Sequence, residues 1–429
     1  MTSIPRRADV IVIGSGPAGN SAASLLAREG LEVVLFEKAR LPRNTVGESL
    51  IPQFWRFVDL IGATDLIEGE KFLTKAGGIG YWRGTARRVR FSDFGYTRPA
   101  LHVERDRFDW LLTENSRRHG VQVFEETRVT QIDAGSPEAT VHWQGDGESG
   151  ATRCRYVVDG SGQSAVFAHQ QGIRIFDPDI RFTSLWGYYV GGNHLTFGGS
   201  VHPFEDRFEH HPVTIQSSFG DWGWIWHIPM RETVSVGVVL PPERLKAFKA
   251  EDDTPEAKFQ GLVREAPIVG KLMEDAEFVG PMYGIRDYAY LPVQLAVENV
   301  YMVGDAAAFV DPINSAGVSF GMYAGFLASW AITRSLHQPE RRAEFRESFC
   351  QLYGDRLSLF RLLAMPSDAP GYLEAAEKAI RGALNTGESE KRLMLTQAVL
   401  TTRSEGILSI LDRLGVDMES GTTELAVPV

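Results

Sequence analysis

Cysteine is scarce in this chain, which has only Cys154 and Cys350 among its 429 residues. Two cysteines so far apart are too few for a disulfide framework or a cysteine-based zinc site, and their scarcity fits a reducing cytoplasm. Basic residues are also in deficit, because 44 Lys and Arg stand against 55 Asp and Glu for a net charge of -11. Such a protein repels phosphate backbones and anionic lipid headgroups, so neither nucleic acid nor a membrane is expected as a partner.

Long hydrophobic runs are absent as well. The first apolar run, residues 10–13, follows two arginines as in an export signal, but it stops at once at Gly14 and is too short for that role. No later segment approaches the roughly 20 apolar residues that a membrane-spanning helix needs. We therefore expect a soluble, cytoplasmic protein. Its 43% hydrophobic content is sufficient for a large α/β core with a second domain joined closely to it.

The N-terminal segment has the pattern of a βαβ unit. Residues 8–13 form an apolar run typical of a buried parallel strand. Residues 18–29 have the small and apolar spacing of a helix that packs on a sheet, and residues 31–37 form the next strand. A ligand site is therefore expected at the first turn of this unit, where the strand gives way to the helix.

That turn has the sequence GSGPAG. At Gly14, Gly16, Ala18 and Gly19 the side chains are absent or small, so the backbone can approach a pyrophosphate while the helix N-terminus offers N–H groups to its charge. Glu37 ends the next strand about 20 residues later, where a carboxylate can accept both ribose hydroxyls. A structural glycine turn with a surface Glu is the alternative. The strand before the turn, the helix after it and the acid beyond it favour a Rossmann-type dinucleotide site.

A second glycine motif occurs late in the chain. Residues 300–303 have the pattern of a strand and lead into Gly304-Asp305. At this point the sequence resembles the superfamily of FAD-dependent monooxygenases and halogenases, in which such a Gly-Asp pair holds the flavin ribityl chain and pyrophosphate. Asp159-Gly160 and the segment 103–109 resemble two further elements of that superfamily.

The resemblance extends over residues 8–317 and implies which residues contact FAD. In the superfamily the arginine at the position of Arg105 contacts the FAD, and the backbone at the position of Val129 meets the adenine. The implied FAD contacts are Gly14, Gly16, Ala18, Gly19, Glu37, Glu48, Ser49, Arg105, Val129, Gly304, Asp305 and Pro312.

The predicted fold class is α/β, with a Rossmann-type FAD-binding domain, an inserted antiparallel-sheet substrate domain and a helical C-terminal region. Aromatic and β-branched residues from 181 to 241 favour the antiparallel sheet, and Pro339 is placed to begin a helix. The expected domains are residues 1–180 with 281–335, residues 181–280, and residues 336–429. Other expected elements are strands at 121–124, 139–143 and 155–158, helices at 107–119, 371–384 and 389–414, and a frayed end at 421–429.

Three motifs narrow the resemblance to the flavin-dependent halogenases. The first is the heptad GWIWHIP at residues 223–229, which matches the tryptophan-containing signature Gly-Trp-x-Trp-x-Ile-Pro of that family. The resemblance implies that Trp224 and Trp226 wall the flavin off from the organic substrate. The alternative is a core strand with alternating aromatic residues.

The second motif is the segment 309–317, which resembles the halogenase pattern Phe-x-x-Pro-x-x-Ser-x-Gly beside the flavin ring. There a loop before a helix presents backbone N–H groups to an anion, which in the family is the halide. The position before the glycine is usually Thr or Ser, but here it is Ala316. Halide contact would therefore depend on the backbone of Ala316 and Gly317. A turn that only seats the flavin is the alternative.

The third motif is Lys75, which follows Gly47-Glu48-Ser49 at the spacing found in halogenases. A lone lysine on a strand is otherwise a solvated edge charge. The resemblance implies that Lys75 is the catalytic residue of an FADH2- and O2-dependent chlorination or bromination of an electron-rich aromatic ring, where it hydrogen-bonds hypohalous acid or forms a haloamine. Burial would support this role by lowering the pKa of the amine.

Partners follow from the same reasoning. No second glycine fingerprint is present for a tightly held nicotinamide cofactor, so the flavin is either reduced transiently by NAD(P)H or arrives already reduced from a partner. We expect the partner, a separate flavin reductase. The substrate is either a free aromatic molecule or a pyrrolyl or phenolic group on a carrier protein. Two arginine groups could dock an acidic carrier, although ordinary solvated charge is the alternative. They are Arg87, Arg88 and Arg90, and Arg341, Arg342 and Arg346.

Two other enzyme classes and a metal site are alternatives to the halogenase. A flavin monooxygenase shares every FAD motif and differs only in the tryptophan heptad, Lys75 and the loop at residues 309–317, here called the anion loop. A flavoprotein that only reduces or dehydrogenates would need neither halide nor oxygen activation. We expect no carboxylate or third histidine at ligand spacing from the pair His210-His211, and therefore a surface pair and no metal.

Overall fold

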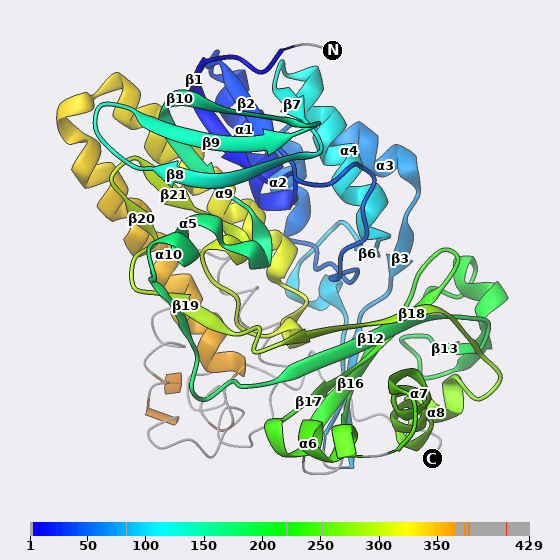
Figure 1. The fold of residues 1–429 in the computed structure, drawn as a ribbon. Coiled ribbons are helices and arrows are strands. Elements are labelled where there is room, and N and C mark those ends of the chain that lie inside the picture. The colour runs from blue at the N-terminus through cyan, green and yellow to red at the C-terminus, as the bar shows by residue number, and fades with distance from the viewer. Residues whose placement is uncertain are drawn as a thin grey trace.

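The computed structural model describes residues 3–364, except positions 83, 220, 221 and 251, and a few isolated positions farther on. Two sheets organise this part of the chain, and Figure 1 shows them as an upper body of strands and helices and a lower, largely separate sheet.

The upper sheet has the order β20-β21-β10-β1-β2-β7, with β9 beside the first half of β10 and β8 beside β9. Parallel pairing joins β1 to β2 and β10, β2 to β7, and β10 to β21. Its strands are β1 (Arg7–Ile13), β2 (Val33–Phe36), β7 (Gln122–Phe124), β8 (Thr127–Asp133), β9 (Ala139–Gly145), β10 (Glu148–Asp159), β20 (Ala296–Val297) and β21 (Val300–Met302).

Helices cover this sheet and complete its core. They are α1 (Pro17–Arg28), α2 (Phe54–Leu60), α3 (Thr64–Glu70), α4 (Arg105–Arg118), α5 (Val166–Gln170), α9 (Gly317–His337) and α10 (Arg342–Ala364), with the 3-10 turns η1 (Phe91–Phe94), η2 (Gly162–Ser164), η4 (Gly304–Ala306), η5 (Pro312–Asn314) and η6 (Pro339–Arg341). Strand β2 is buried at every position, as a central parallel strand requires. The predicted βαβ unit and Rossmann-type domain are confirmed.

Close packing of α9 on α1 brings the late glycine motif beside the early one. A Cβ atom at Gly325 of α9 would lie 2.3 Å from the carbonyl oxygen of Ala18, so only glycine permits this approach. Gly304 is equally crowded, because a Cβ there would lie 2.9 Å from the Cβ of Ala18. Segments nearly 300 residues apart in the sequence therefore meet at one end of β1.

The lower sheet has the order β18-β12-β17-β16-β15-β4-β5. Its strands are β4 (Gly78–Trp82), β5 (Thr85–Val89), β12 (Thr183–Val190), β15 (Thr214–Phe219), β16 (Trp222–Pro229), β17 (Val234–Leu240) and β18 (Glu277–Arg286). All neighbours pair antiparallel except β4 and β15, which are parallel. The antiparallel sheet is confirmed, but it extends beyond residues 181–280, because β4 and β5 complete one edge and β18 ends at Arg286.

Helices α6 (Pro242–Ala250), α7 (Pro255–Glu265) and α8 (Val269–Leu272) belong to this lower body. One apolar cluster joins α7 and α8 to the sheet through Phe259, Val263 and Leu272. Three short strand pairs complete the described chain: β3 (Leu73–Lys75) with β6 (Ala100–His102), β11 (Arg174–Phe176) with β19 (Tyr290–Pro292), and β13 (Asn193–Leu195) with β14 (Val201–Pro203), the last followed by η3 (Phe204–Phe208).

The C-terminal part is helical as far as it is described. Pro339 begins η6, which leads into α10, and α10 packs on the upper body through an edge-on contact of Phe349 with Tyr301 at 5.1 Å. The predictions at 371–384, 389–414 and 421–429 lie outside the described residues. Among the described helices, none is long and apolar enough to cross a membrane.

Candidate active site

A cavity of about 520 Å³ lies where the upper body meets the lower sheet. Its volume is within the range of roughly 300–1,000 Å³ that is usual for ligand sites. Every residue predicted to contact FAD lines this cavity except Gly19. The structure therefore brings together side chains from both ends of the described sequence.

The glycines of the first turn have different tasks. A Cβ atom at Gly14 would lie 2.4 Å from the carbonyl oxygen of Gly160, and one at Gly19 would lie 2.0 Å from that of Gly14, so both are required for backbone packing. At Gly16 the nearest atom to an added Cβ is Nη2 of Arg43, 3.9 Å away. The space beside Gly16 is open to the cavity, as it must be for a pyrophosphate at the N-terminus of α1.

Glu37 is buried at the end of β2 and is held by its neighbours. Its Oε2 accepts hydrogen bonds from the backbone N–H of Ser15 at 3.0 Å and from the Ser15 hydroxyl at 2.7 Å. Its Oε1 accepts one from the N–H of Ala39 at 3.0 Å. Burial alone would raise the pKa of Glu37, but Arg43 and these hydrogen bonds outweigh it and lower the pKa. The carboxylate is therefore ionised and available to ribose hydroxyls.

Two arginines give the cavity positive charge near Gly16. Arg105 binds Asp109 through two hydrogen bonds of 3.0 and 3.2 Å, and Arg43 reaches the same carboxylate at 3.3 Å. Arg105 also donates to the carbonyl oxygen of Val46 at 2.7 Å. Although burial opposes it, Asp109 raises the pKa of Arg105 above its ordinary value. Asp109 and Val46 thus hold the guanidinium of Arg105, the first arginine of the 103–109 motif, in one position. Arg43 also lines the cavity, and the sequence motifs did not indicate it.

Glu48 connects the two bodies. It is 2% exposed, and its Oε1 accepts a hydrogen bond from the hydroxyl of Tyr188 on β12 at 2.9 Å. Its Oε2 accepts one from the N–H of Gly47 at 3.0 Å. Burial raises the pKa of Glu48 despite these hydrogen bonds. Asp305 also lines the cavity, where it is half-buried and accepts a hydrogen bond from Gln163 at 3.4 Å.

Trp224 and Trp226 lie on β16 and line the cavity. They are 2% and 4% exposed, and their rings lie 5.7 Å apart in an apolar cluster with Ile228 and Tyr288. The indole N–H of Trp226 donates to the hydroxyl of Ser235 at 3.1 Å. The two indoles thus pack in the core and also line the cavity. This is compatible both with a wall beside the flavin and with a core strand of alternating aromatic residues.

The anion loop ends at the N-terminus of α9. Gly317 begins the helix and lines the cavity, whereas Ala316 is 6% exposed and lies behind the wall. The first N–H groups of any helix have no partner within it, so this end of α9 can donate to an anion. Ser315, with φ of 51°, also lines the cavity and donates to the Ser49 hydroxyl at 3.1 Å.

Lys75 is at the end of β3 and is 2% exposed. Its Nζ donates to the hydroxyl oxygen of Ser49 at 2.8 Å and to the carbonyl oxygen of Leu50 at 3.2 Å, and it lies 5.2 Å from the centre of the Phe91 ring. Burial lowers the pKa of Lys75 from 10.5 to about 7. The alternative of a solvated edge charge is wrong.

A chain of hydroxyl groups connects Lys75 with the cavity. Lys75 itself does not line the cavity, but Ser49 and Thr214 do. The hydroxyl of Thr214 lies 2.8 Å from that of Ser49 and 2.8 Å from Nε2 of His102. Burial and the charge of Lys75 keep the pKa of His102 well below its ordinary value, so the imidazole is neutral. Thr214 and His102 belong to no motif, and nothing local in the sequence marks them.

The two arginine groups proposed for carrier docking have partners within the chain. Arg88 and Arg90 lie over the ring of Phe197, with guanidinium carbons 5.0 and 4.2 Å from its centre. Arg341 pairs with Glu344, and Arg346 donates to the carbonyl oxygen of Glu298 at 3.0 Å. These contacts leave the docking prediction untested.

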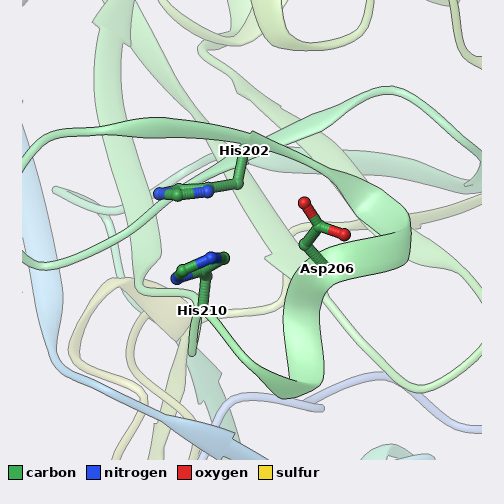
Figure 2. A group of neighbouring side chains, drawn as sticks. All are labelled: His202, Asp206 and His210. Carbon is green, nitrogen blue, oxygen red and sulfur yellow. The ribbon is translucent and has the colours of Figure 1, made fainter.

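The prediction for His210 was wrong in one respect. Asp206 and His202 lie beside it, and the possible ligand atoms of the three side chains are all within 4.8 Å of one another (Figure 2). The spacing of four residues on either side of Asp206 is visible in the sequence and is the signal that identifies this group.

The family model for an FAD binding domain matches residues 7–190. The chain is similar to a tryptophan 2-halogenase of Chondromyces crocatus, with 32% identity over 339 residues that cover 77% of this chain and 62% of that protein. It is similar to the flavin-dependent halogenase armH2 of Armillaria mellea, with 31% identity over 374 residues that cover 81% of this chain and 70% of that protein. It thus spans less than two thirds of the first relative's length.

A solved structure agrees with these relatives. The myxobacterial chondrochloren halogenase CndH, described as a variant of FAD-dependent halogenases, superposes with a TM-score of 0.75 and 26% identity. The superposition covers 94% of this chain and 99% of that one.

Proposed function

Because this chain belongs to the flavin-dependent halogenases, FAD-binding oxidoreductases, we propose that it uses reduced FAD, O2 and chloride or bromide to halogenate an electron-rich aromatic ring. The observation that carries the proposal is the position of Lys75. Its amine is buried, has a pKa of about 7, and contacts the cavity wall through the hydroxyl of Ser49.

The cavity residues fit FAD. Gly16 leaves space for the pyrophosphate at the N-terminus of α1, with Arg43 and Arg105 near its charge. Glu37 is placed for the ribose, and the indoles of Trp224 and Trp226 provide an apolar wall for the flavin ring. When bound and reduced, the flavin supplies the activation of O2 that oxidises the halide to hypohalous acid.

Backbone N–H groups at the start of α9 would hold the halide. Gly317 reaches the cavity directly, and the N–H groups of the first helical turn favour an anion. Because Ala316 replaces the usual hydroxyl residue, the backbone of Ala316 and Gly317 would carry the whole contact. The neighbouring hydroxyl of Ser315 lies at the same edge of the cavity.

Lys75 would take over the oxidised halogen. With a pKa of about 7, a large fraction of the amine is neutral near pH 7 and has a free lone pair. The nitrogen attacks the halogen of hypohalous acid, a nitrogen–halogen bond forms, and hydroxide leaves with an amine proton as water. The aromatic ring then takes the halogen from the haloamine, and its displaced proton restores the amine. Hydrogen bonding of intact hypohalous acid to Lys75 is the alternative form of this step.

Ser49 and Leu50 hold the amine for this chemistry by accepting hydrogen bonds from it. The ring of Phe91, 5.2 Å from the Nζ of Lys75, belongs to an apolar cluster that includes Phe360. We place the aromatic substrate at this cluster, since Phe360 belongs to α10 and the sequence beyond Pro339 has no cofactor motif. The substrate is then separated from the flavin by the wall that contains Ser49 and Thr214.

Substrate, reductant and domain roles complete the proposal. The two relatives are halogenases, and one is a tryptophan halogenase, which supports a small aromatic substrate. The second possibility is a pyrrolyl or phenolic group attached to a carrier protein. A separate reductase would supply the reduced flavin. Residues 1–180 and 281–335 would bind FAD, residues 181–280 with β4 and β5 would form the substrate domain, and the sequence of residues 336–429 would decide which substrate is accepted.

The test combines the purified protein, FAD, NADH and an added flavin reductase with indole, phenol and pyrrole substrates, free and on a carrier protein. Mass spectrometry compares products formed with chloride, with bromide and without halide. A halogenated product that requires Lys75 supports the proposal. Hydroxylated product alone in saturating halide would replace it with the flavin monooxygenase alternative.

A further inference from the structure

Three side chains gather in the lower body, away from the flavin cavity. His202 lies on β14, Asp206 on η3, and His210 on the loop that follows. Figure 2 shows the two imidazole rings stacked face to face with the carboxylate of Asp206 at their side. One possible ligand atom from each side chain lies within 4.8 Å of the other two.

The fold brings these side chains together by itself. The two rings lie 3.9 Å apart with an angle of 24° between their planes. The N–H of His210 donates to the carbonyl oxygen of Asp206 at 2.8 Å, which closes the turn between them. Buried His194, paired with His202 across β13 and β14, donates from Nε2 to the carbonyl oxygen of His210 at 2.6 Å. The backbone of each end of the cluster is therefore anchored.

Two imidazoles and one carboxylate are the ligand types of borderline divalent ions such as Zn²⁺, whereas Mg²⁺ and Ca²⁺ prefer oxygen ligands alone. We propose that His202, Asp206 and His210 bind one divalent transition-metal ion of the Zn²⁺ type, with water in the remaining position. Ligand atoms of a tetrahedral zinc ion lie about 3.3 Å apart, given bonds of about 2.0–2.1 Å. The possible ligand atoms, all within 4.8 Å of one another, are near that spacing, and the two stacked rings would tilt apart so that one nitrogen of each points at the ion.

The place of the cluster in the chain indicates what such an ion would do. From His210 the backbone continues to Pro212, whose carbonyl oxygen accepts a hydrogen bond from the N–H of Ala76 at 2.8 Å. Thr214, at the start of β15, then contacts Ser49. An ion on His210 would therefore brace the segment that leads to the Lys75 network. Metal binding itself does not depend on the proposed halogenation, and the two are measured separately.

The test uses full-length protein without a histidine tag, stripped with EDTA and titrated with ZnCl2 in a calorimeter. We expect one Zn²⁺ per chain, no comparable binding of Mg²⁺, and a higher thermal midpoint with Zn²⁺. His202→Ala and Asp206→Asn should each weaken binding by at least about tenfold, since even outer partners of metal ligands contribute that much. His211→Ala, the neighbouring histidine outside the cluster, is the matched control and should bind as the wild type does.

Three results would overturn the site: no saturable Zn²⁺ binding by the wild type, unchanged affinity in both cluster variants, or equal loss in His211→Ala. The thermal midpoint of each stripped variant shows whether it is folded. Asp206→Asn keeps the shape of the side chain, so it tests the site even where His202→Ala is destabilised.

Discussion

The Nζ atom of Lys75 lies 2.8 Å from the hydroxyl oxygen of Ser49, and through this one hydrogen bond a lysine that does not line the flavin cavity contacts a residue that does. Under the proposed function, a small oxidant made in the cavity would reach the amine past Ser49, and the organic substrate would stay apart from the flavin. Because Lys75 does not line the flavin cavity, its amine could be required for halogenation without being required for FAD binding.

Lys75→Met should abolish halogenation while FAD binding and flavin oxidation continue. The side chain keeps its length but loses the amine, so a loss of at least about 10²–10⁴-fold in product is expected, as for removal of a positioned acid–base group. Lys75→Arg should also fail, because a guanidinium stays protonated and cannot form a haloamine. Product is measured by mass spectrometry and flavin by absorbance. Halogenation at the wild-type rate in Lys75→Met would remove the lysine from the mechanism.

Stability should depend on pH through the same lysine. Its pKa in the folded state is about 7, against 10.5 for the ordinary side chain. Between these values the unfolded chain binds more protons, so the free energy of unfolding rises with pH, and below about pH 7 the full cost of burying the charge applies. Relative to Lys75→Met, the wild type should therefore lose on the order of 5 kcal/mol between about pH 10.5 and 7. Urea unfolding of both proteins across that pH range measures the difference. If the free energy of unfolding changed with pH in the same way for both proteins, the prediction would be wrong.

Thr214→Val tests the hydroxyl chain. The substitution keeps the shape of the side chain but removes the partner of both Ser49 and His102, whose buried polar atoms lose a hydrogen bond. We expect a loss of about 1–3 kcal/mol in the free energy of unfolding and a fall in product that is smaller than for Lys75→Met. Thr130→Val, at an exposed position of β8, is the control and should change stability by less than about 0.5 kcal/mol. Equal behaviour of the two variants would rule out a special role for Thr214.

Gly16→Val should yield colourless protein. A branched side chain there fills the open space beside Arg43 that the pyrophosphate needs. Gly261→Val is the matched control, because an added Cβ at that position of α7 meets no atom within 4 Å. Bound flavin is measured by absorbance after gel filtration. If Gly16→Val retained one flavin per chain, the cofactor site would be assigned wrongly.

Reduction of the flavin should require a second enzyme. The chain has one dinucleotide-binding glycine motif that follows a strand, the GSGPAG turn, and this turn lines the cavity that fits FAD. Anaerobic addition of NADH or NADPH alone should bleach the flavin slowly or not at all, and a flavin reductase should make bleaching fast. Rapid bleaching by NADPH without a reductase would favour a monooxygenase.

Local patterns in the sequence were sufficient for the elements and for much of the cofactor site. The GSGPAG turn, Glu37 and the Gly304-Asp305 pair each depend on a strand that ends beside them, and such strands are visible as apolar runs. The extent of the lower sheet was not visible in local patterns. Residues 78–89 join the lower sheet because β4 pairs with β15, a contact across more than 100 positions that no local pattern encodes.

The sequence by itself determined the Rossmann-type unit, because that unit depends on neighbours a few residues apart, whereas the later FAD motifs and the candidate Lys75 came from the resemblance to flavin-dependent halogenases. Only the tertiary structure decided that Lys75 is buried with a lowered pKa, since its surroundings come from Ser49, Phe91 and Leu50 in other segments. It also decided that His202 and His210 stack beside Asp206. Burial and charge are properties of the packed surroundings, and long-range contacts create those surroundings only when the chain folds.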